Sequence, residues 1–320
     1  MRKKNVRYRS LSPLTPLSPL SASLRMSRTT GMQRILRGHL LLARISNSPT
    51  VISNVLAGVA LGGKLWPDLS VGLVMLAMLC FYSAGMYLHD LMDYVTDCRE
   101  HPERPLPSGL VTRASAVNVM LLLFSTGCFL LSLIGAIPLL WGVLLGILII
   151  CYDRWHRRNP FSPLLMGLCR GMVYLIAFLA CTTQYQVRDL WQVLIASTLL
   201  VCYVTSLTAL AKTERRITVP TIIVIFSLFL PLLHIITHLS WTSLWLLPLV
   251  AGFMSWNWYS ISFIYWRPRR PIARAVGQLV AGISLVDALI LAVSGSIVGV
   301  AVALLAFGWT LFLQRYVRGT

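Results

Sequence analysis

The sequence predicts an all-α fold, a polytopic transmembrane helical bundle of nine to ten spans. Of its 320 residues, 57% are hydrophobic and 12% are charged, whereas a soluble domain carries roughly 25% charged residues. Apolar runs of about 20 residues recur along most of the chain, each long enough to cross a hydrocarbon core of about 30 Å as a helix. The alternating segments of an outer-membrane barrel are absent from the sequence, so these runs are expected to be helices.

The N-terminal stretch 1–38 differs from the rest of the chain. It is basic and rich in Arg, Ser, Leu and Pro, and Pro13, Pro16 and Pro19 argue against a continuous helix. We expect a disordered N-terminal tail over 1–38 and a transmembrane domain over 39–320. Two interpretations of the tail stay open: a basic segment near anionic lipid, and an organelle transit peptide, which would be Arg-rich and poor in acids.

Ten hydrophobic segments follow the tail and are joined by short connections. The fourth is short for a full span. We place them near residues 41–63, 70–89, 114–134, 137–152, 162–182, 190–210, 218–239, 242–264, 275–294 and 297–315.

The net charge of +18 is explained by membrane topology. Lys and Arg accumulate in cytoplasmic loops, and here every second connection is rich in Arg. The alternate connections carry only Lys64, Asp68, Arg188 and Asp189. Ten spans with both termini in the cytoplasm satisfy this pattern. The expected partner of the basic surface is therefore the lipid bilayer, and no nucleic acid partner is expected.

The segment from His89 to Gly109 holds five of the ten acidic residues of the chain. If the second helix continues through it, Asp90, Asp93 and Asp97 lie within roughly 60° of one another on one helix face. Three neighbouring carboxylates repel one another, and a divalent cation with oxygen ligands would compensate their charge. Magnesium usually binds through one or two carboxylates plus phosphate oxygens, so the pattern predicts a metal-bridged phosphate or diphosphate site. The alternative is an ordinary solvated loop.

The residues after these carboxylates support a phosphate site. Pro102, Pro105 and Pro107 end the helix. Arg99 and Arg104 place fixed cations beside the carboxylates, where guanidinium groups are suited to holding phosphate oxygens.

This segment resembles the first signature of the UbiA superfamily of intramembrane prenyltransferases. The family pattern is NDxxDxxxD followed by RPL-x-SG, and the chain reads HDLMDYVTD and then RPLPSG. The stretch LARISNSPTVISNVLAGVALGG is similar to the family's first helix, with Arg44 at its start. The stretch YDRWHRRNPFSPLLMGLCRGMVYL is similar to the region of the fourth and fifth helices and contains Arg170. The resemblance covers about Arg44 to Arg216.

The resemblance implies a helical bundle around a central cavity open to lipid, and a magnesium-dependent transfer of a polyprenyl group from a polyprenyl diphosphate donor to a small-molecule acceptor. Asp90, Asp93 and Asp97 would be the catalytic residues and the ligands of Mg²⁺. Arg44, Arg104, Arg170 and Lys212 would bind the diphosphate. The expected location is the bacterial inner membrane, with the site on the cytoplasmic side.

Two departures separate the chain from the family pattern. His89 stands where the family carries Asn. The second Asp-rich motif should end the sixth helix, but YVTSLTALAKTERR contains no Asp, and Glu214 is its only acid. Three interpretations stay open. Lys212, Arg215 and Arg216 substitute fixed positive charge for a second ion, an unusual substrate is used, or prenyl transfer is lost. In the last case the protein binds or transports an isoprenoid-like or aromatic metabolite.

One further acid lies inside a predicted span. Asp287 falls in the segment 275–294, and an ionisable residue within a membrane span is expected to be functional or to face a partner. Two interpretations stay open for Asp287: a polar partner inside the bundle, or a second site.

Overall fold

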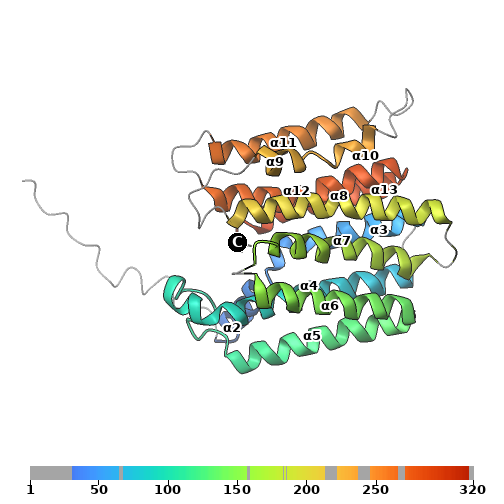
Figure 1. Ribbon diagram of the computed structural model, residues 1–320. Coiled ribbons are helices and arrows are strands. Elements are labelled where there is room, and N and C mark those ends of the chain that lie inside the picture. The colour runs from blue at the N-terminus through green and yellow to red at the C-terminus, as the bar shows by residue number, and fades with distance from the viewer. Residues whose placement is uncertain are drawn as a thin grey trace, which may run out of the picture.

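The computed structural model describes residues 31–64, 68–156, 159–182, 184, 186–212, 222–236, 246–265 and 271–316. Over these residues the chain is helical and contains no strand, as the sequence predicts. The long helices run along a common direction and form one bundle (Figure 1). Their bounds are α2 Gly31–Leu42, η1 Ile45–Asn47, α3 Pro49–Leu61, α4 Leu69–Glu100, α5 Arg113–Ile134, α6 Ala136–Trp155, α7 Ser162–Cys181, α8 Val187–Lys212, α9 Ile222–Ser227, α10 Leu232–Ile236, α11 Leu247–Tyr265, α12 Ile272–Val293 and α13 Ile297–Leu313.

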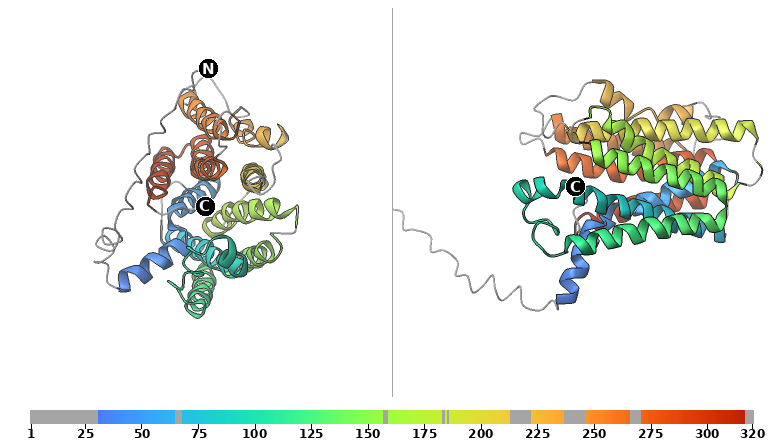
Figure 2. Two further views of the ribbon diagram at one scale, coloured as in Figure 1. Left: turned by 90° about the vertical axis from the view of Figure 1, so that its left-hand side faces the viewer. Right: turned by 60° about the horizontal axis from the view of Figure 1, so that its bottom comes forward.

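Helix α3 lies inside the bundle. It contacts α4, α7, α8, α12 and α13, and the end-on view places it among the other helices (Figure 2, left). Eleven of its side chains, from Pro49 to Leu61, are buried. The small residues Ala57, Gly58 and Ala60 let neighbouring helices approach it closely.

Six of the described helices are long and apolar enough to cross a membrane: α4, α5, α6, α7, α8 and α12. Two shorter apolar stretches are Ile45–Leu61 and Ile297–Leu313. Several of these helices expose large apolar side chains. On α5, Leu122, Phe129 and Leu133 are each more than half exposed, which suits lipid as the surrounding solvent. The protein is therefore an integral membrane protein.

Helix α4 provides the framework of the site. Asp68 caps its start by accepting a hydrogen bond from the Val71 N–H. The helix then continues without interruption past the apolar run to Glu100. It ends just before Pro102, as the sequence predicts.

The prediction of one helix over 41–63 is wrong. Helix α2 ends at Leu42, and Arg44 takes a left-handed backbone conformation with φ of 44°, which an α-helix cannot contain. The chain changes direction there, so that α2 projects away from the bundle while α3 enters it (Figure 2, right). Helix α2 begins at Gly31, within the stretch that the sequence assigns to the tail.

The predicted segment 218–239 also differs from the structure. Its described part holds two short helices, α9 and α10, joined by a turn that includes Pro231. Pro231 lacks the N–H that a continuous helix needs at this point. Residues 213–221 and 237–245 lie outside the described residues, and with them Glu214, Arg215 and Arg216.

Candidate active site

Asp90, Asp93 and Asp97 share one face of α4 and are buried. Their exposed fractions are 7%, 5% and 2%. Carboxylates are buried only where partners compensate their charge. The solvated-loop interpretation predicts exposed side chains and is wrong for these three.

Two arginines from other segments pair with the outer carboxylates. Arg44 Nη2 lies 3.3 Å from Asp90 Oδ1, and Arg104 Nη1 lies 2.7 Å from Asp97 Oδ2. Arg104 comes from the loop after α4, so the proline-rich turn folds back onto its own helix. Arg44 comes from the break before η1, and it therefore brings the N-terminal part of the chain to the same face.

The left-handed conformation at Arg44 is held by neighbouring groups. The Tyr82 hydroxyl donates a hydrogen bond to the Arg44 carbonyl oxygen over 3.2 Å. Among the described residues, Arg44 is the only non-glycine with positive φ. Such a conformation is uncommon outside glycine and tends to occur where a side chain must take a particular position. Here it accompanies the pairing of Arg44 with Asp90.

Arg170 is held by a buried polar network that crosses the bundle. Its Nη1 donates to Asn54 Oδ1 over 2.9 Å, and Asn54 Nδ2 donates to both carboxylate oxygens of Asp287 over 2.8 and 2.9 Å. Tyr174 and Ser53 also donate to Asp287, which is fully buried. Asp287 therefore has polar partners inside the bundle, the first of the two interpretations that the sequence leaves open.

Lys212 lies apart from the carboxylates of α4. Its Nζ donates to the Asn159 carbonyl over 3.0 Å and to the Ser162 hydroxyl, at the start of α7. Lys212 does not line the central cavity in the described part of the chain. The structure thus brings Arg44 and Arg104 to the carboxylates, ties Arg170 to α3 and α12, and ties Lys212 to the connection before α7.

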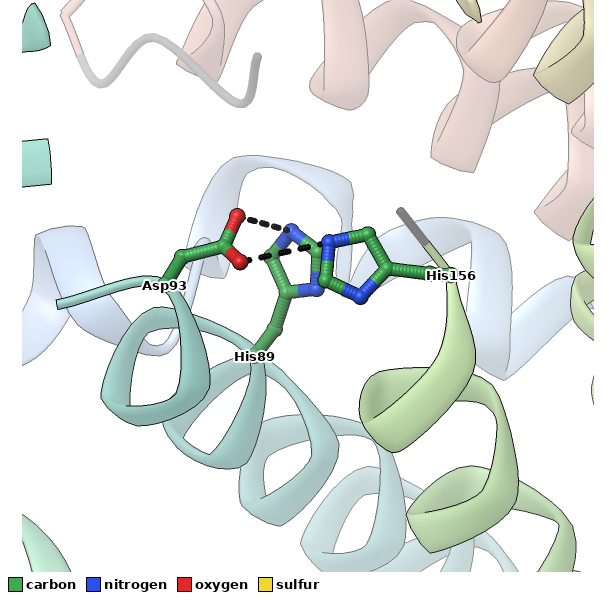
Figure 3. Close-up of side chains that lie close together, drawn as sticks. All are labelled: His89, Asp93 and His156. Atoms are coloured by element: carbon green, nitrogen blue, oxygen red, sulfur yellow. Dashed lines mark ion pairs between the residues drawn. The ribbon is translucent and has the colours of Figure 1, made fainter. Parts of the chain in front are cut away.

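His89, Asp93 and His156 form a cluster that the sequence analysis does not anticipate (Figure 3). His89 Nε2 lies 3.8 Å from Asp93 Oδ2, and His156 Nε2 lies 3.2 Å from Asp93 Oδ1. His89 and Asp93 are one turn apart on α4, whereas His156 follows the end of α6. Spacing alone reveals the first pair, but the third member depends on how α4 packs against α6.

Nearby acids favour the charged form of His156. Burial opposes that charge, but the hydrogen bonds to Asp93 and to the Asp153 backbone, together with the negative charge of both carboxylates, outweigh it. The pKa of His156 is therefore raised above its ordinary value.

A cavity of about 340 Å³ lies between α3, α4, α6, α7, α8 and α12. Its volume falls within the range of small-molecule sites, roughly 300–1,000 Å³. Most of the wall is apolar, and the polar lining includes Arg44, Arg104, Asp153, Arg170 and Tyr82. The Arg170 guanidinium carbon lies 5.3 Å from the centre of the Tyr82 ring, so the ring faces that cation. An anionic head near the arginines and an apolar tail along the walls would suit this cavity.

The carboxylates suit a divalent cation. Asp90 and Asp97 each have one arginine partner, whereas Asp93 contacts only the imidazoles of His89 and His156 among the ion pairs described. The carboxylate oxygens of all three are donors of the type that magnesium prefers. Arg44 and Arg104 connect this acidic face to the cavity, because each pairs with a carboxylate and lines the cavity wall.

Comparison with known families supports the same interpretation of the chain. Residues 51–267 match the model of the UbiA prenyltransferase family, which covers more than half of the sequence.

Curated relatives match shorter parts of the chain. The digeranylgeranylglyceryl phosphate synthase of Methanosarcina mazei is 32% identical over 111 residues, or 34% of this chain and 38% of that protein. The synthase of the same name from Thermococcus kodakarensis is 28% identical over 152 residues, 47% and 52% of the two chains. The 4-hydroxybenzoate octaprenyltransferase of Blochmanniella pennsylvanica is 35% identical over 127 residues, 38% and 43%. The chain thus spans between 38% and 52% of the length of these relatives.

Two solved structures share the fold. One comes from a study of digeranylgeranylglyceryl phosphate synthase in membranes; it has a TM-score of 0.57 at 18% identity and covers 83% of this chain and 99% of that chain. The other is a UbiA homologue from Archaeoglobus fulgidus, with a TM-score of 0.56 at 13% identity and coverage of 82% and 99%. At these identities the similarity establishes the fold alone.

Proposed function

The chain belongs to the UbiA prenyltransferase family, and from this membership we propose that it transfers a polyprenyl group from a polyprenyl diphosphate to a small-molecule acceptor within the membrane. The observation that carries the proposal is the burial of Asp90, Asp93 and Asp97 on one helix face, beside an apolar cavity whose wall includes two of their neighbouring arginines.

The polar and the apolar parts of the cavity wall suit the head and the tail of the donor, respectively. Arg44, Arg104 and Arg170 are positive groups on its wall, and guanidinium groups bind diphosphate oxygens through paired hydrogen bonds. The apolar remainder of the wall would hold the isoprenoid tail and exclude water from the allylic carbon. That carbon becomes electrophilic as its bond to the diphosphate oxygen breaks, and the acceptor then forms the new bond.

Asp90, Asp93 and Asp97 would hold a magnesium ion at the head of the donor. Such an ion, when bound, supplies stabilisation of the negative charge on the leaving diphosphate. Arg44 and Arg104 keep the outer carboxylates in place. Lys212 was a candidate for the diphosphate, but its contacts with Asn159 and Ser162 favour a role in positioning the start of α7.

We place the site at the cytoplasmic side of the membrane, by the positive-inside rule. Arg44, Arg99, Arg104 and Arg113 all lie near the end of the bundle where α4 finishes and α5 begins. An inner-membrane location in a bacterium is part of the same proposal. The acceptor is an aromatic compound or a lipid-pathway intermediate. The relatives are named for both kinds of compound, an aromatic acid, 4-hydroxybenzoate, and a lipid, digeranylgeranylglyceryl phosphate.

The proposal is tested with purified full-length protein in lipid nanodiscs. It is incubated with magnesium, a labelled allylic diphosphate of graded chain length, and either an aromatic acid or a glyceryl phosphate lipid. We expect release of diphosphate and a labelled, prenylated product. Asp93→Asn should lower kcat/KM by about 10²–10³-fold, the usual loss when one group that stabilises developing charge is removed.

Asp189→Asn is the matched control, because Asp189 is a partly buried acid at the other end of the bundle, in the first turn of α8. It should leave turnover unchanged. If neither acceptor class nor any donor length yields product, the transferase proposal is wrong.

A second function is favoured by one observation, the absence of an Asp from the end of α8. The protein would then bind or carry an isoprenoid-like or aromatic metabolite without transferring a prenyl group. Binding of a non-hydrolysable diphosphate analogue that Asp93→Asn leaves unchanged, with no turnover of the reactive donor, would favour this alternative.

A further inference from the structure

The His89–Asp93–His156 cluster brings three donor atoms of different residues together. One nitrogen of each imidazole and one carboxylate oxygen all lie within 4.8 Å of one another. In a tetrahedral site with bonds of about 2.0–2.1 Å, neighbouring donors are about 3.3 Å apart. His156 Nε2 lies 3.2 Å from Asp93 Oδ1, close to that separation, and His89 Nε2 lies 3.8 Å from the other oxygen, Oδ2.

The other nitrogen of each ring is already engaged by Asp153. His89 Nδ1 lies 2.9 Å from the Asp153 carboxylate, and His156 Nδ1 lies 2.9 Å from the Asp153 backbone carbonyl. A carbonyl oxygen can only accept, so His156 Nδ1 carries a proton. His156 would therefore bind a metal through Nε2, and the metal would take the place of the Nε2 proton that faces Asp93. Metal-binding histidines commonly donate their second N–H to a carboxylate or a carbonyl in this way.

The location of Asp153 supports a site built around it. Its exposed fraction is 4%. Asp153 lies on α6 and reaches His89 of α4 because the two helices pack against each other. Asp153 thereby contacts both imidazoles, the His89 ring through its side-chain carboxylate and the His156 ring through its backbone carbonyl.

We propose that His89, Asp93 and His156 bind a divalent transition metal of the zinc class. Two imidazole nitrogens beside one carboxylate oxygen favour such an ion over magnesium, which prefers oxygen ligands alone. The site lies at the acidic face of the proposed function and deepens it, because Asp93 would then hold a softer ion than its neighbours Asp90 and Asp97. Metal binding itself does not require that function to be correct.

The test uses full-length protein purified without a polyhistidine tag and stripped of metal by a chelator. Cobalt(II) is added in the presence of excess magnesium, and the visible absorption of the bound ion is recorded. Zinc(II) then competes with cobalt(II) in the same sample. We expect one cobalt ion per chain, a spectrum with nitrogen and oxygen ligands at low coordination number, and complete displacement by zinc.

Variants separate binding at this cluster from binding elsewhere. His156→Ala should abolish the cobalt spectrum, and Asp153→Asn should weaken binding by about 10–100-fold, as expected for a residue that orients metal ligands. His89→Asn, which installs the residue of the family pattern, should lose preference for cobalt over magnesium. His101→Ala is the control, because the His101 side chain, which follows the end of α4, is 43% exposed and its ion-pair partner is Glu103. It should leave the cobalt titration unchanged.

The thermal unfolding midpoint of each variant in detergent identifies those that fail to fold, and Asp153→Asn and His89→Asn are isosteric or nearly so. If cobalt binding is unaffected by His156→Ala, or if magnesium at equal concentration prevents it, the inference is wrong and the cluster is an ion pair between protonated imidazoles and Asp93. Prenyl transfer supported by magnesium alone in that protein would leave the proposed function intact. Cobalt binding without any prenyl transfer would overturn the proposed function and leave the metal site.

Discussion

At the scale of single residues, Asp287 shows how a buried acid can act on a distant cation. It is fully buried in α12 and receives hydrogen bonds from Ser53, Asn54 and Tyr174. Asn54 in turn accepts from Arg170, whose side chain lines the cavity. Asp287 is thus a positioning residue for Arg170, and Asn54 and Arg170 lie between it and the cavity.

We predict that Asp287→Ala raises the KM for the prenyl diphosphate more than it lowers kcat, because Arg170 loses its fixed position while the carboxylates of α4 remain. The variant also leaves Asn54 and Tyr174 without an acceptor, which costs about 1–3 kcal/mol for each buried group. Steady-state kinetics and thermal unfolding measure the two effects.

Tyr174→Phe is the comparison variant, because it removes one donor to Asp287 and leaves the contact between Asn54 and Arg170 in place. Its KM should stay near that of the unaltered protein. An equal rise of KM in both variants would mean that Asp287 acts through packing and not through Arg170.

The sequence could identify those site residues whose role follows from their spacing along one helix or the adjacent turn. Asp90, Asp93 and Asp97 follow from helix periodicity, and Arg104 follows from its place in the adjacent turn. Asn54, Asp153 and His156 could not be found in this way. Their partners lie on other helices, and the contacts depend on tertiary packing that a single sequence does not contain.

At the scale of helices, α7 and α8 approach each other through glycines. Gly167 and Gly171 are four residues apart on α7 and flank Arg170 on its two sides. A Cβ atom at Gly167 would lie 2.7 Å from the Val201 backbone oxygen, and one at Gly171 would lie 2.6 Å from a Val201 side-chain methyl. Small residues at this spacing allow two membrane helices to pack closely.

We predict that Gly167→Ala forces α7 away from α8, because its new methyl group would meet backbone of α8. Overpacking of this kind costs about 1–3 kcal/mol, and it should also reduce diphosphate affinity by displacing Arg170. Thermal unfolding in detergent and the KM for the donor are the measurements.

Gly252→Ala on α11 is the matched control, since a Cβ there meets nothing within 4 Å. Its unfolding midpoint should be unchanged or slightly higher, because alanine favours a helix more than glycine does. Equal destabilisation by both substitutions would contradict close packing of α7 on α8 as the cause.

The sequence predicts most long helices to within a few residues, because their apolar residues outnumber the polar ones over a full span. Helix α8, for example, spans 187–212 against the expected 190–210. The prediction fails at 41–63, where the polar residues Arg44, Ser46, Asn47 and Ser48 mark a turn between two helices. The break there is fixed by contacts of Arg44 with α4, which hydropathy does not encode.

At the scale of the whole molecule, the cavity and the acidic face are arranged along the bundle. Arg44, Arg104 and Arg170 are the arginines of the cavity wall. Met78 on α4 lies about 18 Å along the helix from Asp90, at 1.5 Å per residue, and it also lines the cavity. The cavity therefore extends from the charged end well into the apolar interior, which suits a ligand with a small anionic head and a long tail.

We predict that Met78→Trp shortens the longest prenyl chain that the protein accepts, because the indole would occupy the apolar end of the cavity. The ratio of kcat/KM for long against short donors should fall, while the value for the shortest donor stays similar. A series of allylic diphosphates assayed in parallel gives this ratio. Leu305→Trp is the control, since Leu305 is 72% exposed on α13. A fall of the same size in both variants would exclude cavity length as the cause.

The backbone of Arg44 has a consequence for protein engineering. Glycine adopts a left-handed conformation without strain, whereas another residue there costs on the order of 1–3 kcal/mol. Replacing Arg44 by glycine would remove that strain but would leave the buried Asp90 carboxylate without its partner, a loss of about 3–5 kcal/mol for a buried pair. Position 44 is therefore one to leave unaltered when the protein is stabilised for structural work.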